Sequence, residues 1–175
     1  MRIDTVLGDI TEETTDAIVN AANSSLLGGG GVDGAIHRAA GPRLLDECRR
    51  LRQTTLPDGL PVGQAVATAA YDLPCRWVIH TVGPNYHAGE TDPKLLVSCF
   101  AESLRVAAEL GAASVAFPAV SAGVYGWAPE AVAEAAAIAI EAAESDPAPS
   151  PVQLVRFVLF SQAVLNIFAK TFPGR

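Results

Sequence analysis

Short β-rich segments alternate with helical segments along the whole chain, and this alternation limits the folds that the chain can adopt. The segments 64–71 and 77–82 are joined by a connection too short for a parallel crossover, so we expect an antiparallel hairpin. The other connections contain helical patterns, which favour parallel strands covered by helices. We therefore predict an α/β protein, a three-layer α/β/α domain with a mixed six-stranded sheet. The expected strands cover residues 1–7, 17–21, 64–71, 77–82, 114–120 and 154–160.

The expected helices follow from capping residues and from the spacing of apolar side chains. Apolar residues recur at intervals of three and four between positions 95 and 110, which predicts one buried helical face. Pro129 suits the first turn of an alanine-rich helix, and Ser161 suits the N-cap of a final helix. Thr11 is expected to cap a first short helix. Besides the final one, the expected helices cover residues 12–15, 34–40, 42–51, 95–110 and 130–144.

Four consecutive glycines, residues 28–31, follow the second expected strand. Residues without a Cβ take positive φ readily and let a ligand approach the backbone. Asn20 and Asn23 precede this tract, and Asp33 follows it at the expected start of a helix. A second glycine-containing loop, residues 121–126, follows the fifth expected strand. Because ligands bind at the carboxyl ends of strands in α/β sheets, we expect both loops to lie at one site.

The chain has a formal net charge of −7 and contains only two lysines, Lys94 and Lys170. This charge works against non-specific binding to nucleic-acid phosphates. If the protein binds a phosphate group, backbone N–H groups must supply most of the contacts, as they do at helix N-termini and in backbone nests. The glycine loops suit that role.

At 175 residues the chain is long enough to bury a full core, and we expect a single domain over residues 1–175. The three cysteines form no C-x-x-C pair, which favours a reducing compartment. The N-terminal residues lack the apolar core of a signal peptide, and no apolar run reaches the length of a membrane span. We expect a cytoplasmic monomer that does not bind membranes.

Two nucleotide-binding motifs and one hydrolase motif are excluded. Residues 29–34 match G-x-G-x-x-G in form, but several residues separate them from the preceding strand, and the acid expected about twenty residues later on a second strand is missing. No G-K-[ST] follows a glycine run, which excludes a P-loop. Ala119 stands two positions before Ser121, where the nucleophile elbow of serine hydrolases requires glycine.

The three histidines, His37, His80 and His87, show no spacing typical of a metal site. We therefore expect no metal and no cofactor. Each histidine is expected to be packed or hydrogen-bonded rather than catalytic, and the cysteines are expected to be core or surface residues rather than ligands.

A set of short motifs spans nearly the whole chain. They are GDIT (8–11), NAAN (20–23), GGGGVDGAIH (28–37), AGP (40–42), YDLP (71–74), IHTVGP (79–84) and AFPAVSAGVYG (116–126). With these motifs the chain resembles the macrodomain family, and within it the MacroD-type ADP-ribosyl hydrolases. The resemblance implies a pocket for ADP-ribose.

The resemblance also implies which residues hold the nucleotide. Asp9 would accept a hydrogen bond from the adenine amino group beside the N–H of Ile10, and Phe160 would cover the adenine face. The residues themselves leave alternatives open, since Asp9 also suits a turn and Phe160 also suits the core. The diphosphate would lie between the two glycine loops. Its expected backbone donors are the N–H groups of Gly31, Val32, Ser121, Gly123, Val124 and Tyr125.

At the other end of the ligand, Tyr125 would lie over the distal ribose and Asn23 would hold its hydroxyl groups. Asn20 would brace the glycine loop. The acid of the MacroD-type enzymes corresponds to Asp33, which would position or deprotonate a water near the distal ribose, so Asp33 and Asn23 are the expected catalytic residues. Alternatively, Asp33 would be the N-cap of the helix that starts at residue 34.

The activity that the resemblance implies is metal-independent removal of single ADP-ribose units from aspartate and glutamate esters of proteins, with O-acetyl-ADP-ribose as a further substrate. The expected partners are ADP-ribose and mono-ADP-ribosylated proteins. A module that binds ADP-ribose without turnover and a hydrolase of ADP-ribose attached to nucleic acid stay open as alternatives. Departures from the family pattern at residues 127–128 and 161 leave the substrate preference open.

Overall fold

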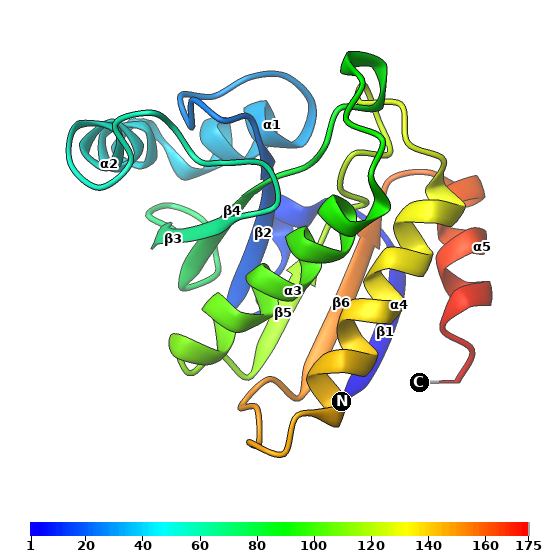
Figure 1. The fold of residues 1–175 in the computed structure, drawn as a ribbon. Helices are drawn as coiled ribbons and strands as arrows, with labels where there is room; N and C mark the ends of the chain where they lie inside the picture. Colours follow the sequence, from blue (N-terminus) through cyan, green and yellow to red (C-terminus); the bar gives the residue numbers. More distant parts are fainter. Residues whose placement is uncertain (175) are drawn as a thin grey trace.

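The computed structural model describes residues 1–174 and contains a mixed six-stranded sheet (Figure 1). Its strands are β1 (Arg2–Leu7), β2 (Ala17–Ala22), β3 (Ala65–Ala69), β4 (Trp77–Val82), β5 (Ser114–Phe117) and β6 (Leu154–Leu159). The strand order is β1-β6-β5-β2-β4-β3, and neighbours are parallel except for the antiparallel pair β3–β4. The predicted fold class, mixed sheet and hairpin are confirmed.

The helices are α1 (Gly31–Ala40), α2 (Pro42–Gln53), α3 (Pro93–Glu109), α4 (Pro129–Ser145) and α5 (Gln162–Thr171), with short 3-10 turns η1 (Ile10–Glu12) and η2 (Tyr86–Ala88). They cover both faces of the sheet, and α3 and α4 lie in front of it in Figure 1. In β2, Ile18 packs into the core beneath α1 and α2, whereas Val19 packs into the core beneath α3, α4 and α5. Within residues 1–174, no helix is long and apolar enough to cross a membrane.

The core beneath α3, α4 and α5 contains a cluster of phenylalanines. The ring of Phe157 in β6 contacts those of Phe100, Phe117, Phe168 and Phe172, with ring centroids 6.3, 5.8, 5.1 and 5.1 Å away. Such tilted and offset pairs add to the stabilisation that burial of the rings provides. The cluster ties α3 and the chain around α5 to the carboxyl-terminal halves of β5 and β6, which precede the second glycine loop and Phe160.

Several elements begin or end at other residues than expected. The first helical turn is η1, and its N-cap is Asp9, whose carboxylate accepts from the Thr11 N–H at 2.9 Å; the helix expected over residues 12–15 with a Thr11 cap is wrong. Helix α1 begins three residues before the expected position because its packing on the sheet outweighs the low helix propensity of the glycines. Strand β5 ends early because Pro118 has no N–H for the ladder.

Candidate functional site

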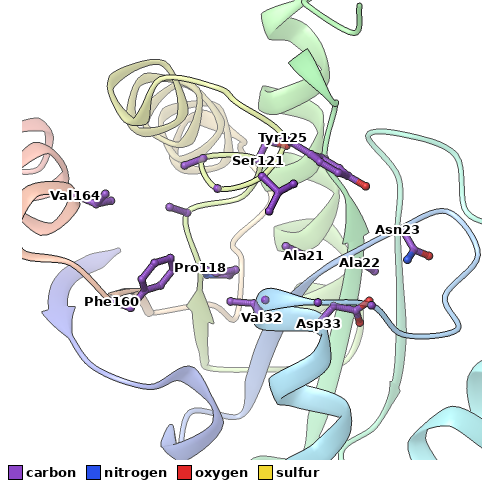
Figure 2. Close-up of a pocket in the computed structure, with 18 of the residues that line it drawn as sticks. Ala21, Ala22, Asn23, Val32, Asp33, Pro118, Ser121, Tyr125, Phe160 and Val164 are labelled. Atoms are coloured by element: carbon purple, nitrogen blue, oxygen red, sulfur yellow. The ribbon is translucent and has the colours of Figure 1, made fainter. Parts of the chain in front are cut away.

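A pocket of about 580 Å³ opens at the carboxyl ends of β2, β5 and β6. Figure 2 shows the loop with Ser121 and Tyr125 on one side and the start of α1, with Val32 and Asp33, on the other. The expectation that both glycine loops lie at one site is therefore confirmed. The lining residues are 21–23, 29–33, 83, 118, 119, 121–125, 159–161 and 164. Asn23, Gly31, Val32, Asp33, Ser121, Gly123, Val124, Tyr125 and Phe160 are among them, whereas Asp9, Ile10 and Asn20 lie outside the lining.

The first glycine loop and the start of α1 form one wall. The first N–H groups of a helix lack partners inside the helix and carry partial positive charge, so this end of α1 favours an anion. Packing restricts the side chains that positions 34 and 29 can carry. A Cβ on Gly34 would lie 2.6 Å from the carbonyl oxygen of Gly29. A Cβ on Gly29 would lie 3.1 Å from Oδ2 of Asp33 and 3.3 Å from Nδ2 of Asn23.

The second glycine loop forms the opposite wall and is held by the chain that follows β4. The N–H of Tyr86 donates to the Tyr125 carbonyl at 2.8 Å, and Nε1 of Trp127 donates to the Pro84 carbonyl at 3.1 Å. Gly126 has φ +78°, and a Cβ there would overlap the ring of His87. These contacts fix the backbone N–H groups of the loop before a ligand arrives.

Ser121 begins this loop in the left-handed region, with φ +67°. This backbone conformation is uncommon for a residue with a Cβ. Its side chain packs so closely on residue 83 that only glycine fits there, because a Cβ would overlap Oγ. Among residues 1–174, the buried Oγ of Ser121 has no hydrogen-bond partner. A buried hydroxyl without a partner is uncommon in a folded protein.

Asp33 lies in the first turn of α1, and its carboxylate lines the pocket while the residue is only 4 % exposed. The N-cap of α1 is Gly30, so the alternative in which Asp33 caps the helix is wrong. Oδ1 of Asp33 accepts a hydrogen bond from Nδ2 of Asn20 at 2.9 Å and lies 3.4 Å from Nε2 of His37. The carboxylate is thus held by neighbours on one side and faces the pocket on the other, as a group that acts on a bound molecule must.

Asn20 is fully buried in β2 and differs from its expected role. Its Nδ2 group contacts Oδ1 of Asp33 and also lies 3.1 Å from Nδ1 of His80, so Asn20 braces the carboxylate and not the glycine loop. His80 is fully buried in β4, and its Nε2 lies 2.9 Å from Oγ1 of Thr68. Burial, together with the charge of nearby His37, lowers the pKa of His80 to about 3, so its imidazole is neutral at neutral pH.

Asn23 shapes the glycine loop and lines the pocket at the same time. Its Nδ2 donates to the carbonyl of Gly28 at 3.0 Å, and its Oδ1 accepts from both the N–H and the hydroxyl group of Ser25. The amide has two donor hydrogens and two acceptor lone pairs, so these bonds leave one donor hydrogen on Nδ2. Asn23 can therefore hold the loop and contact a bound hydroxyl group.

At the far end of the pocket, Phe160 follows β6 and is 75 % exposed, so the alternative that it belongs to the core is wrong. Asp9 lies on the neighbouring strand end, because the N–H of Gly8 donates to the Leu159 carbonyl at 2.9 Å. The carboxylate of Asp9 accepts hydrogen bonds from the backbone N–H and the hydroxyl group of Thr11, as expected for a residue in a turn. Ile10 is buried under α1.

Two histidines beside Asp33 were not expected at the site. His37 follows Asp33 by four positions on α1, and this spacing places both side chains on one helix face. His80 pairs with Asn20 in the register of β2 and β4. The spacing of His37 is visible in the sequence, whereas the pairing of His80 depends on strand order. Over residues 1–174, no group of three or more His, Cys, Asp and Glu side chains could hold a metal ion.

The comparisons with known proteins agree with this geometry. The family model for the Macro domain matches residues 19–136. A macro domain-containing protein of Streptomyces coelicolor is 58 % identical to this chain, and the match covers 94 % of this chain and 94 % of that protein. The O-acetyl-ADP-ribose deacetylase of Escherichia coli K12 is 55 % identical, and the match covers 77 % of this chain and 76 % of that protein. A point mutant of the Oceanobacillus iheyensis macrodomain, solved with ADPR, has a TM-score of 0.88 and 42 % identity and covers 95 % of this chain and 89 % of that one. The chain therefore belongs to the macrodomain family.

Proposed function

We propose that the pocket binds ADP-ribose and that the protein hydrolyses bonds between ADP-ribose and an acyl group. The observation that carries this proposal is the Asp33 carboxylate, buried at the edge of a pocket whose two walls are glycine loops rich in backbone N–H groups. The relative named O-acetyl-ADP-ribose deacetylase and the related macrodomain solved with ADPR support the same ligand.

The shape of the pocket suits the parts of this ligand. Phe160 offers an exposed ring for the adenine, with Asp9 and Ile10 on the adjoining strand end. The diphosphate would lie between the start of α1 and the second loop, where N–H groups and the helix dipole favour negative charge. The distal ribose would then lie between Tyr125, Asn23 and Asp33. This arrangement binds two phosphates without lysine, in keeping with the acidic composition.

In the reaction, Asp33 positions or deprotonates a water beside the distal ribose. Asp33 takes one proton from the water, and the water oxygen bonds to one of two carbons. Attack at the ester carbonyl carbon breaks the acyl C–O bond, and Asp33 returns the proton to the ribose oxygen that leaves. Attack at the anomeric carbon breaks the bond between that carbon and the ester oxygen, and the acid leaves as a carboxylate. The products are ADP-ribose and a free carboxylic acid. The proposed substrates are aspartate and glutamate esters of mono-ADP-ribosylated proteins, and O-acetyl-ADP-ribose. A general base of this kind contributes about 10²–10⁴-fold to the rate.

The test measures release of ADP-ribose from a glutamate-linked protein substrate and from O-acetyl-ADP-ribose by the wild type, Asp33→Asn and Asp58→Asn. Asp58 is an exposed acid outside the pocket, so its substitution controls for the loss of one charge. We expect Asp33→Asn to lose roughly 10²–10⁴-fold in kcat while it still binds ADP-ribose, and Asp58→Asn to match the wild type.

The alternatives give other results when an ADP-ribosylated oligonucleotide is added to the substrates. A wild type that binds ADP-ribose and releases none from any ester is a binding module. Release only from an ADP-ribosylated oligonucleotide would replace the protein substrate with nucleic acid. Full activity of Asp33→Asn would refute the role of the carboxylate.

A further inference from the structure

Behind Asp33, a chain of buried polar groups crosses three strands beneath α1. The Oγ1 hydroxyl of Thr68 in β3 donates to the Ala69 carbonyl at 3.1 Å and lies 2.9 Å from Nε2 of His80 in β4. Nδ1 of His80 lies 3.1 Å from Nδ2 of Asn20 in β2, and the same Nδ2 donates to Oδ1 of Asp33 at 2.9 Å. Thr68 and His80 lie outside the pocket lining, so they can act on a ligand only through this chain.

The donors and acceptors along the chain are assigned from its far end, the hydroxyl of Thr68. Thr68 uses its one hydroxyl hydrogen on the Ala69 carbonyl, so its oxygen accepts from Nε2–H of His80. A neutral imidazole that carries its proton on Nε2 has an acceptor at Nδ1. Nδ1 therefore accepts from one hydrogen of the Asn20 amide, and the other hydrogen donates to Asp33.

The opposite orientation of the Asn20 amide is unfavourable in this environment. It would place Oδ1 of Asn20 against two acceptors, Nδ1 of His80 and the carboxylate of Asp33. In the observed orientation both donor hydrogens are used, and Oδ1 is the atom left without a hydrogen-bond partner within residues 1–174. This orientation leaves one acceptor unpaired, whereas the opposite one would leave two donor hydrogens unused and set the oxygen against two acceptors.

We infer that His80 is a positioning residue for Asp33: as the Nε2–H tautomer selected by Thr68, it holds the Asn20 amide with its donors toward the Asp33 carboxylate. The carboxylate is thereby kept in one orientation toward the pocket. Only the kinetic test of this inference rests on the proposed function. The tautomer of His80 and the orientation of the Asn20 amide are properties of the protein without ligand.

Thr68 offers a matched pair of variants for the test. Thr68→Ser keeps the hydroxyl, whereas Thr68→Val keeps the shape and removes the acceptor for Nε2–H. Without that acceptor, the proton of His80 can move from Nε2 to Nδ1. Nδ1–H would then be a donor that faces the donor hydrogens of the Asn20 amide. We expect Thr68→Val to lose about tenfold in kcat, and we expect Thr68→Ser to stay within about twofold of the wild type. The dissociation constant for ADP-ribose should change less than about twofold in both.

Variants of His80 itself provide the second arm. In His80→Asn, the side-chain oxygen can take the place of Nδ1 and accept from Asn20, whereas His80→Leu fills similar space without an acceptor. We expect His80→Asn to recover at least part of the activity that His80→Leu loses. A role in packing alone predicts the reverse order, because leucine fills the buried space better than asparagine does.

Nitrogen-15 NMR of the histidine rings gives a readout that needs no turnover. We expect His80 in the wild type to be protonated at Nε2 and not at Nδ1, and we expect a measurable Nδ1–H population in Thr68→Val. If the wild type hydrolyses no substrate but shows this tautomer, the proposed function fails and the hydrogen-bond chain stands. An Nδ1–H tautomer in the wild type, or wild-type kcat in Thr68→Val, would overturn the inference.

Discussion

The backbone of Gly29 lies directly against the Asp33 carboxylate, so that a Cβ at position 29 would come within 3.1 Å of Oδ2 and 3.3 Å of Nδ2 of Asn23. Both polar side chains therefore approach one point of the glycine loop. The neighbouring Gly30 differs, because a Cβ there would point into open space. The two glycines serve different purposes, although they are adjacent in a uniform tract.

This difference predicts that Gly29→Ala impairs catalysis and Gly30→Ala does not. The added methyl group at position 29 must displace Asp33 or Asn23 by a few tenths of an ångström, and misplacement of catalytic groups is costly. We expect kcat to fall at least about tenfold in Gly29→Ala and to stay within about twofold in Gly30→Ala, whose φ of −93° suits alanine. Steady-state kinetics on O-acetyl-ADP-ribose check both. Equal losses in the two variants would contradict the prediction.

The second loop supports a parallel prediction for binding. Gly126→Ala combines a φ of +78° with overlap against the His87 ring, so the loop between Ser121 and Gly126 must move. By calorimetry, we expect the affinity for ADP-ribose to fall about tenfold or more in Gly126→Ala. Unchanged affinity in Gly126→Ala would show that this loop does not contact the diphosphate.

Phe160 is expected to contribute to the binding of ADP-ribose and not to the stability of the fold. Because its ring is 75 % exposed, Phe160→Ala should leave the free energy of unfolding nearly unchanged. Loss of a stacked base weakens binding by about 1–3 kcal/mol, so we expect the affinity for ADP-ribose to fall about fivefold or more. Leu7→Ala, another exposed apolar residue outside the pocket, is the control. Calorimetry with adenosine diphosphate and with ribose 5-phosphate shows which part of the ligand Phe160 contacts. The loss of affinity in Phe160→Ala should appear with adenosine diphosphate, which contains adenine, and not with ribose 5-phosphate.

The sequence predicts the fold well because its signals are local. The alternation of strands and helices, the short connection before Trp77 and the Ser161 cap each depend on neighbouring residues, and the structure confirms them. One error lies where local signals conflict with packing. Glycines argue against a helix at Gly31, yet α1 begins there because its other residues pack on the sheet.

The site is predictable only in part, for a physical reason. Asp33 and Asn23 can be found because they flank a conspicuous glycine tract. The partner of Asn20 cannot be found in this way, since His80 lies sixty positions farther along the chain and becomes its neighbour only when β4 pairs with β2. Such pairings depend on strand order, which the local pattern leaves open.

The buried His80 also predicts how stability depends on pH. In the folded protein, burial and the neighbouring His37 lower the pKa of His80 to about 3, whereas an unfolded histidine has a pKa near 6.5. At pH values below 6.5, the folded state therefore binds fewer protons than the unfolded state. The free energy of unfolding should therefore fall as the pH drops from 6.5 toward 3, and at pH 5 this group accounts for about 2 kcal/mol. His80→Asn removes this group, and all other ionisable side chains are the same in both proteins. Urea unfolding at pH 7.5 and pH 5 should show a decrease smaller by about 2 kcal/mol in His80→Asn than in the wild type. Parallel decreases would mean that His80 is protonated in the folded protein at pH 5, which its burial between Asn20 and Thr68 argues against.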